Sequence, residues 1–340
     1  MPRLPLPHPG PALRPLAIVG LLVFIALVVM GQAFGGPPGR STPAPLPPDQ
    51  LELRVFDVGQ GDAILLRSGQ RALLVDAGPD PETAREVLLP RLARLGVDGL
   101  DGLVLTHADA DHIGGAADIL EVLPVATVWM ASSRQDHPLL SVIEAAAMQG
   151  GTRVEAPANG QALEWHPAVS VQVNIAEPSV ASGDNNQSLV LHVRFRESDF
   201  LLTGDIERAA ERALVKTVSS LEADVLKVAH HGASTSSSPE FLAAVKPQVA
   251  IVSAGLGNAF NHPRDEVLRR LRGVGAQVFR TDLAGDVVVR TDGHEITVAL
   301  ERASVRRRRS WRRRRRRGPR RQCVRGGAVR RERGCRGPRR

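Results

Sequence analysis

The chain has 340 residues, 43% of them hydrophobic, which is enough for one large folded domain or two ordinary ones. The net charge of +8 combines two opposite parts: residues 303–340 hold nineteen Arg and one acidic residue, which is +18, so the first 302 residues carry −10. Both cysteines, Cys323 and Cys335, lie in the basic part. The composition therefore excludes a disulfide and a thiolate metal ligand from the acidic body of the chain.

The first 36 residues predict a hydrophobic N-terminal segment. Leu16–Met30 contains no polar residue, and Gly31–Gly36 extends this run to a length just sufficient to cross a bilayer, for which about 20 residues are needed. Arg3 and Arg14 precede the run. We expect an uncleaved anchor that leaves the rest of the chain outside the cytoplasmic membrane, with a cleaved signal peptide and a secreted protein as the alternative.

Two further segments lack the pattern of a packed core. Residues 37–50 are rich in proline and predict an extended linker. Residues 303–340 show no apolar periodicity and are expected to be disordered. This Arg-rich tail can contact nucleic acid or another polyanion, or it has no selected role.

The folded body is predicted over residues 51–302, in two halves that each run from β-rich sequence into alternating strands and helices. The first half opens with two hairpin-like strands within Leu51–Gly78, and the second opens with a strand at Ser188–Phe195. This pattern predicts an α/β protein, a four-layer α/β/β/α sandwich with the site along one edge of two sheets. The helices expected are Pro81–Leu95, Ile113–Leu123, Pro138–Gln149, Ile206–Ser219 and one ending at Arg272, and the later strands include Gly102–Thr106, Thr127–Met130, Gln277–Arg280, Asp286–Arg290 and Glu295–Leu300.

A run of six residues, His107-Ala108-Asp109-Ala110-Asp111-His112, holds four side chains that can ligate a metal ion. The run follows an apolar strand and precedes a helix, and ligands of open α/β sheets collect at the carboxyl ends of strands. So many polar groups are costly to hold together unless a positive charge neutralises them. An ordinary helix N-cap accounts for one Asp but not for both flanking His. We therefore predict a metal site.

The second half supplies polar residues at further strand ends. Asp205 ends the buried strand of FLLTGD, and His230 and His231 end the next β segment. His262 lies in a loop directly before a helix, where a plain turn residue is the alternative interpretation. Because these positions fall at the same predicted edge, we expect them to complete the metal site.

The body from about Leu51 to Leu300 resembles the metallo-β-lactamase fold and, within it, the C-terminal extracytoplasmic domain of the ComEC competence DNA-uptake channels. The resemblance rests on FDVGQGDAILL, LLVDAG, THADADHIGG, GDNNQSLVL, FLLTGD, LKVAHHG and NHPR, whose order and spacing cover nearly the whole body. It implies the four-layer fold and a metal-dependent hydrolase that uses a metal-activated water.

The resemblance also implies a ligand set that departs at one position from the H-x-H-x-D-H motif of that superfamily. Asp109 stands where the second His is expected, and Asp205 corresponds to the carboxylate that bridges two metal ions. His230 corresponds to the distal His, with His231 or His262 as substitutes. A further His is expected near Asp184–Ser188, where only carboxyl, amide and hydroxyl groups are present. The implied metal ligands are His107, Asp109, Asp111, His112, Asp205 and His230.

Two divalent ions, Zn²⁺ or Mn²⁺, are the implied cofactors, because imidazole suits Zn²⁺ and an oxygen-rich first site favours Mn²⁺. Two such ions can clamp the attacking and leaving oxygens of a displacement. The implied catalytic residues are Asp111, Asp205 and His262. The residues expected to orient ligands or contact substrate are Asp57, Asp62, Asp76, Asn186, His231 and Asn261, although Asp57 also suits a simple turn.

The leading functional prediction is hydrolysis of a phosphodiester, most simply a nucleic acid strand, outside the cytoplasmic membrane. The acidic body would repel a polyanion unless local basic patches or the Arg-rich tail compensate. Two alternatives remain: hydrolysis of a small ester, lactone or lactam, and a catalytically inactive, membrane-anchored protein that binds nucleic acid.

Overall fold

The computed structural model describes residues 46–131, 137–177, 181 and 183–302, all within the unit of the chain that ends at Ala303. The predicted N-terminal anchor, most of the predicted linker and the Arg-rich tail lie outside these residues. Within the described ranges, no helix has both the length and the apolar character that crossing a bilayer requires.

Eight strands form the larger sheet, in the order β14-β13-β1-β2-β3-β4-β5-β6. The hairpin-like stretch gives three antiparallel strands rather than the two expected, and β3 to β6 then run parallel. The strand β13 pairs with β1 and β14 pairs with β13, so the last two strands of the body extend the sheet beyond its first strand. The strands are β1 (Leu51–Val55), β2 (Ile64–Ser68), β3 (Arg71–Val75), β4 (Gly102–Leu105), β5 (Thr127–Met130), β6 (Arg153–Glu155), β13 (Asp286–Thr291) and β14 (Ile296–Glu301).

Six strands form the second sheet, in the order β12-β11-β10-β9-β8-β7. The strands β7, β8 and β9 are antiparallel, whereas β9, β10, β11 and β12 are parallel. The strands are β7 (Ser170–Asn174), β8 (Val190–Phe195), β9 (Ser198–Leu202), β10 (Val225–Lys227), β11 (Val249–Val252) and β12 (Gln277–Arg280).

The predicted helices are present with two local breaks, and the structure adds short helices at Pro239–Val245 and Thr281–Ala284 that were not predicted. The predicted helix at Pro81–Leu95 contains a π-helical turn next to Pro90, which has no N–H to donate within the helix. The predicted helix Ile113–Leu123 begins earlier, at Ala110, and divides at Gly114, where a Cβ would collide with the carbonyl of Pro79. The helical elements are α2 (Pro81–Thr83), η1 (Ala84–Leu88), α3 (Leu89–Arg94), α4 (Ala110–Ile113), α5 (Ala116–Val122), α6 (Pro138–Gln149), η2 (Asn185–Gln187), α7 (Arg208–Thr217), η3 (Ala229–Gly232), α8 (Pro239–Val245), α9 (Asp265–Gly273) and α10 (Thr281–Ala284).

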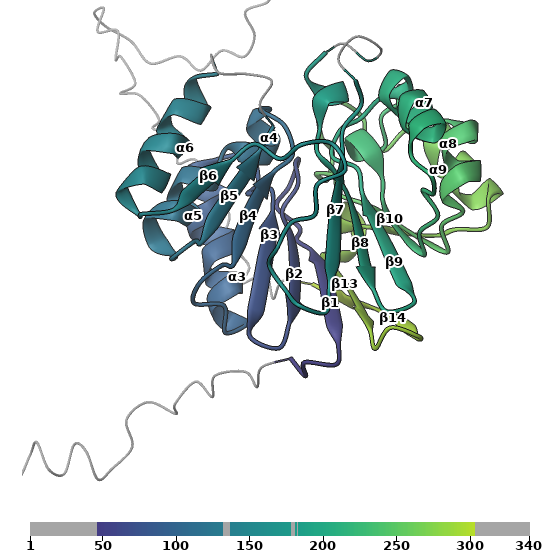
Figure 1. Cartoon of the computed structure of the whole chain (residues 1–340). Coiled ribbons are helices and arrows are strands. Elements are labelled where there is room, and N and C mark those ends of the chain that lie inside the picture. Colours follow the sequence, from purple (N-terminus) through teal and green to yellow (C-terminus); the bar gives the residue numbers. More distant parts are fainter. Residues whose placement is uncertain (1–45, 132–136, 178–180, 182, 303–340) are drawn as a thin grey trace, which may run out of the picture. The chain divides into compact units, whose positions relative to one another are not determined.

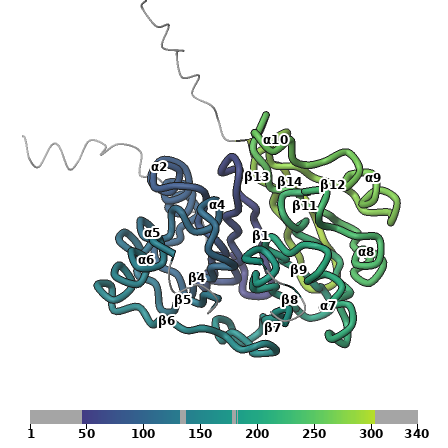
Figure 2. Tube along the Cα trace, turned by 90° about the horizontal axis from the view of Figure 1, so that it is seen from above, coloured from purple at the N-terminus to yellow at the C-terminus, as the bar shows by residue number. Residues whose placement is uncertain are grey.

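Three apolar cores separate four layers, which confirms the predicted sandwich (Figure 1). The central core lies between the sheets and includes Leu53, Leu66 and Val289 of the larger sheet with Leu191 and Phe200 of the second. A second core packs α3, α5 and α6 against the larger sheet, and a third packs α7, α8 and α9 against the other (Figure 2). Alternate residues of the strands therefore face different cores, as strand geometry requires.

The topology brings the carboxyl ends of several strands to one edge of the sandwich. The strands β3 and β4 are parallel neighbours in one sheet, and β9, β10 and β11 are parallel neighbours in the other. The loops that follow these strands carry nearly all the polar residues singled out in the sequence. The site is therefore built from loops of both sheets, supported by rigid strands.

Candidate metal centre

The loop after β4 and the helix α4 contribute four candidate ligands, His107, Asp109, Asp111 and His112. Asp109 occupies the position before α4 with an extended backbone, but its side chain makes no capping hydrogen bond. Its Oδ2 lies instead 3.6 Å from Nε2 of His107. The helix-cap interpretation of this Asp is therefore wrong. The loop after β1 packs against the same turn, since the N–H of Asp62 donates to the carbonyl of Asp111 at 3.1 Å.

The imidazole of His112 is fixed by a carboxylate from the neighbouring strand. Asp76, which follows β3, accepts hydrogen bonds from the backbone N–H and the hydroxyl of Thr106, both at 2.8 Å. Nδ1 of His112 lies 2.7 Å from Oδ2 of Asp76. Because a carboxylate only accepts, Nδ1 carries a proton, and Nε2 is the nitrogen directed into the site.

Two further imidazoles are held in the same way. Nδ1 of His231 lies 2.9 Å from the carbonyl oxygen of Ser253, so it too carries the proton. Nδ1 of His107 lies 3.1 Å from the hydroxyl oxygen of Thr106, which already donates its own proton to Asp76 and therefore accepts from the ring. In all three histidines Nδ1 is hydrogen-bonded to a protein oxygen, and Nε2 is directed into the site.

These Nε2 atoms converge on Asp205, which follows β9. Oδ1 of Asp205 lies 3.2 Å from Nε2 of His112, and Oδ2 lies 3.3 Å from Nε2 of His231. Nε2 of His231 is also 3.2 Å from Oδ2 of Asp111. The Nε2 atoms of His107, His112 and His231, together with Oδ1 of Asp205, are buried without a hydrogen-bond partner.

Such a set fits a divalent cation. Sets of ligand atoms lying within 4.8 Å of one another are formed by His107, His112 and Asp205, and by Asp111, His112 and His231. Neutral imidazole nitrogens and carboxylate oxygens are ligands of Zn²⁺ and Mn²⁺, and a cation would satisfy atoms that the protein leaves unpaired. The donor chemistry therefore agrees with the predicted metal site.

Charges within this cluster are strongly coupled. Burial alone would raise the pKa of Asp111, but the adjacent imidazoles of His231 and His112 lower it to about 2. Burial likewise opposes protonation of His231, yet Asp205 and Asp111 raise its pKa to about 9. Asp205 and Asp76 hold the pKa of His112 well above its usual value despite burial. A metal ion must therefore displace protons from these rings, so its affinity should rise with pH.

A buried ion pair that the sequence analysis missed lies beside the cluster. Nζ of Lys227, fully buried in β10, is 2.6 Å from Oδ2 of Asp62. Oδ1 of the same Asp62 lies 3.6 Å from Nδ1 of His231. The pair thus neutralises a carboxylate next to the imidazoles. The signal in the sequence was one charged residue inside the apolar run VLKVA, which we had interpreted only as a strand.

His230 and His231 differ although they are adjacent. Both have a left-handed backbone, with φ of 49° and 52°, which directs the two side chains apart. His231 is buried in the cluster, whereas Nδ1 of His230 lies 3.3 Å from Glu207 and its Nε2 is 3.9 Å from Asp205. His230 therefore lies at the mouth of the site rather than at its centre.

The other residues singled out in the sequence lie around the cluster. Asp57 forms a turn, accepting from the N–H of Gly59 at 3.4 Å. Asn186 accepts from the N–H of Glu207 at 3.0 Å and so caps α7. Asn261 and His262 belong to the loop after β11, where the ring of His262 lies 5.8 Å from that of His230.

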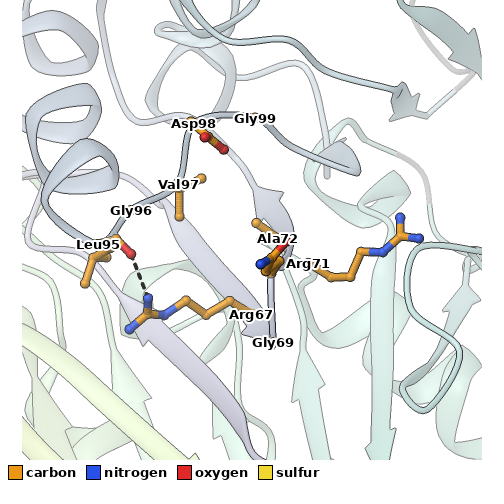
Figure 3. Close-up of a pocket in the computed structure, with 10 residues that line it drawn as sticks. Arg67, Gly69, Arg71, Ala72, Leu95, Gly96, Val97, Asp98 and Gly99 are labelled. Carbon is orange, nitrogen blue, oxygen red and sulfur yellow. Dashed lines mark hydrogen bonds between the residues drawn. The ribbon is translucent and has the colours of Figure 1, made fainter. Parts of the chain in front are cut away.

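A separate pocket of about 280 Å³ lies around Gly69, in the turn before β3 and so at the other end of that strand from Asp76 (Figure 3). Its two arginines are already paired: Arg67 donates to the carbonyl of Leu95 at 3.0 Å, and Arg71 forms an ion pair with Asp101. This pocket therefore offers no free cationic group from either arginine, and the converging ligand atoms lie elsewhere.

Comparison with known proteins agrees with the fold. Residues 56–255 match the metallo-beta-lactamase superfamily. The chain belongs to this superfamily, which confirms the resemblance seen in the sequence.

Particular relatives are competence and recombination proteins. The chain is 32% identical over 257 residues to ComE operon protein 3 of Bacillus subtilis (strain 168), covering 70% of this chain and 33% of the relative. It is 33% identical to competence protein ComA of Neisseria gonorrhoeae, covering 81% of this chain and 35% of that protein. Recombination protein 2 of Haemophilus influenzae is 32% identical, with 70% and 28% covered. The chain thus spans about a third of the length of these curated relatives.

Among solved structures, the metallo-beta-lactamase fold protein YhfI from Bacillus subtilis superimposes with a TM-score of 0.50 at 14% identity. The superposition covers 71% of this chain and 100% of YhfI. At this identity the similarity concerns the fold.

Proposed function

We propose that the protein is a metal-dependent phosphodiesterase that cleaves nucleic acid outside the cytoplasmic membrane. The observation that carries the proposal is the convergence of three tethered imidazoles and Asp205, whose inward-facing atoms have no hydrogen-bond partner. Membership of the metallo-beta-lactamase superfamily supports a hydrolase. Relatives named for competence and recombination support a nucleic acid as substrate.

Two divalent ions, Zn²⁺ or Mn²⁺, are the proposed cofactors. Their proposed ligands are the predicted ones, except that one histidine is replaced by its neighbour. His107, Asp109, Asp111, His112 and Asp205 keep their roles. His231 takes the place given to His230, because its Nε2 is within 3.3 Å of both Asp111 and Asp205 whereas that of His230 is not. When bound, such ions supply Lewis acidity to a phosphoryl oxygen and increase the acidity of water.

The surrounding residues position this ligand set. Asp76, Thr106 and the carbonyl of Ser253 fix Nδ1 of the three rings, so that each Nε2 faces the site and can ligate a metal ion that displaces its proton. Burial and the positive charges of His230 and His231 lower the pKa of His262 to about 4, so this ring is neutral at pH 7. A neutral His262 at the rim carries one N–H and can donate one hydrogen bond to a substrate oxygen.

The flanking segments have proposed roles as well. The hydrophobic segment of residues 1–36 would anchor the chain in the membrane, and the Arg-rich tail would contact the polyanionic substrate. The tail would offset the repulsion that the acidic body exerts on a nucleic acid strand.

The proposal is tested with the full chain, stripped of metal and then supplied with Mn²⁺, Zn²⁺ or Mg²⁺. We expect metal-dependent cleavage of single- or double-stranded DNA that falls by more than about 100-fold in Asp111→Asn, since even residues that only orient metal ligands are worth about 10- to 100-fold. Asp98→Asn, an exposed carboxylate outside the cluster, is the matched control and should cleave normally. Hydrolysis of a small ester, lactone or lactam without any DNA cleavage would contradict the proposal, as would binding of DNA without any hydrolysis.

A further inference from the structure

The loop Gly255–His262, which follows β11, carries an exposed aromatic ring at the rim of the cluster. Phe260 is 57% exposed, and it is the only aromatic among the large hydrophobic side chains exposed in the described part of the chain. The whole chain has eight Phe, three Trp and no Tyr. An exposed aromatic ring is therefore unusual on this protein, and its position beside a candidate site needs a reason.

Hydrogen bonds from one side chain fix the conformation of this loop. The amide nitrogen of Asn258 donates to the carbonyls of Gly255 and His262 at 2.8 and 2.7 Å. Its amide oxygen accepts from the N–H groups of Phe260 and His262 at 3.1 and 3.0 Å. One side chain thus fixes the backbone on both sides of Phe260, so the exposed position of the ring is built into the loop.

Phe260 is the outermost of a series of rings that leads into the cluster. Its ring stacks on that of His262, with centroids 5.8 Å apart and an interplanar angle of 15°. The ring of His262 is 5.8 Å from that of His230, which is 6.3 Å from that of His231. The two inner pairs meet edge-on, at interplanar angles of 67° and 71°. A flat group placed on the free side of Phe260 would therefore extend the Phe260–His262 stack, at the outer end of a series of ring contacts that reaches a proposed metal ligand.

We propose that Phe260 is a stacking platform for an unpaired nucleobase, which makes single-stranded nucleic acid the preferred substrate. This inference rests on the proposed phosphodiesterase function and specifies its substrate class. Any base can stack on an aromatic ring, whereas the bases of a duplex have both faces covered by their neighbours. Stacking also supplies affinity without positive charge, which suits a body with a net charge of −10.

The test measures binding in the absence of chemistry. The full chain is kept metal-free with chelator at raised salt, and its affinity is measured by fluorescence anisotropy for a short labelled DNA single strand, an abasic strand of equal length and the corresponding duplex. Phe260→Ala should weaken binding of the base-containing strand about tenfold and leave the abasic strand unchanged. Phe260→Trp should restore binding. Val142→Ala, which trims a comparably exposed apolar side chain on α6 (55%), is the matched control and should bind like the wild type.

Equal affinities of the wild type and Phe260→Ala for the base-containing strand would overturn the platform, as would equal weakening for the abasic strand. Thermal unfolding of Phe260→Ala verifies that the variant folds, as expected for an exposed side chain. The two proposals can fail separately. Metal-dependent DNA cleavage without a Phe260 effect leaves the phosphodiesterase standing, and a Phe260 effect on binding without any cleavage leaves the platform standing.

Discussion

Two groups of buried charges, one formed by loops of both sheets and one on the larger sheet, differ in how they are satisfied. On the outer face of the larger sheet, Glu52 is fully buried and accepts hydrogen bonds from Arg54, Arg67 and Arg290 at 3.3, 3.0 and 2.8 Å. Arg54 in turn donates to Glu301 at 2.6 Å. We call these five residues the arginine network. At the carboxyl ends of the strands, by contrast, three imidazoles and Asp205 keep atoms without a partner.

The difference separates a structural role from a binding role. Buried polar groups in native proteins are nearly always paired, so a closed set of ion pairs such as the arginine network needs no ligand to explain it. In the cluster, Nδ1 of each imidazole is hydrogen-bonded to a protein oxygen, whereas Nε2 has no hydrogen-bond partner. Such a cluster is organised to receive a cation. The comparison predicts that changes in the cluster affect metal binding and activity, whereas changes in the arginine network affect stability.

The largest effect is expected from the two adjacent histidines. His231→Ala should lower metal affinity and DNA cleavage by more than about 100-fold, because it removes an imidazole that contacts both Asp111 and Asp205. His230→Ala should lower them by less than about tenfold, since this ring faces Glu207. His192→Ala, a histidine of β8 paired with Asp199, is the control. Calorimetric metal titration of each variant measures the difference, and equal losses in both would contradict the assignment of His231.

Glu52→Gln tests the arginine network. Removing one partner of a buried ion pair costs about 3–5 kcal/mol, and we expect about 3 kcal/mol because Arg290 is partly exposed to water. Urea unfolding of the metal-free protein measures the loss, with the exposed Glu144→Gln as control. The metal affinity of folded Glu52→Gln should equal that of the wild type. A change in metal affinity without a loss of stability would break the comparison.

A smaller effect is expected from Asp76→Asn. The amide keeps the size of the side chain and tolerates the left-handed backbone at φ 58°, but it loses acceptor capacity toward the Thr106 hydroxyl and His112. Loss of a group that orients a metal ligand costs about 10- to 100-fold in metal affinity or activity. Asp118→Asn, a buried carboxylate on α5 paired with Arg85, should leave affinity unchanged. The prediction fails if both variants bind metal equally.

The weakest effect concerns acid stability. Burial tends to raise the pKa of Glu52, but Arg67, Arg54 and Arg290 lower it below 4.5. A carboxylate with a depressed pKa in the folded state stabilises the protein above its unfolded pKa, and that stability is lost as pH falls through the folded value. The stability difference between wild type and Glu52→Gln should thus be constant above about pH 4.5 and shrink below it. Urea unfolding over this range measures it, and a difference independent of pH would refute the ionic origin.

Much of the fold followed from the sequence because its patterns are local. Alternation of apolar residues marked most strands, and the run His107–His112 marked a metal site from side-chain chemistry alone. The break at Gly114 could not be predicted, because it depends on contact with Pro79, which is distant in sequence.

The parts of the site that could not be predicted depend on backbone direction or on distant contacts. His230 and His231 are the same residue type at adjacent positions, and only the folded structure shows that His231 contacts Asp111 and Asp205 while His230 faces Glu207. The pair between Asp62 and Lys227 joins residues far apart in the chain. Asn186 has the side chain of a ligand but is used to cap α7, a role that requires knowing where that helix begins.

The most direct test of the account is the metal content of the full chain. The protein is stripped, loaded separately with Zn²⁺ and with Mn²⁺, and analysed for bound metal beside Asp205→Asn. We predict two ions per chain in the wild type with at least one of these metals, and one ion or none in the variant, because Asp205 lies within reach of both His112 and His231. A wild-type protein that binds neither metal would contradict the account.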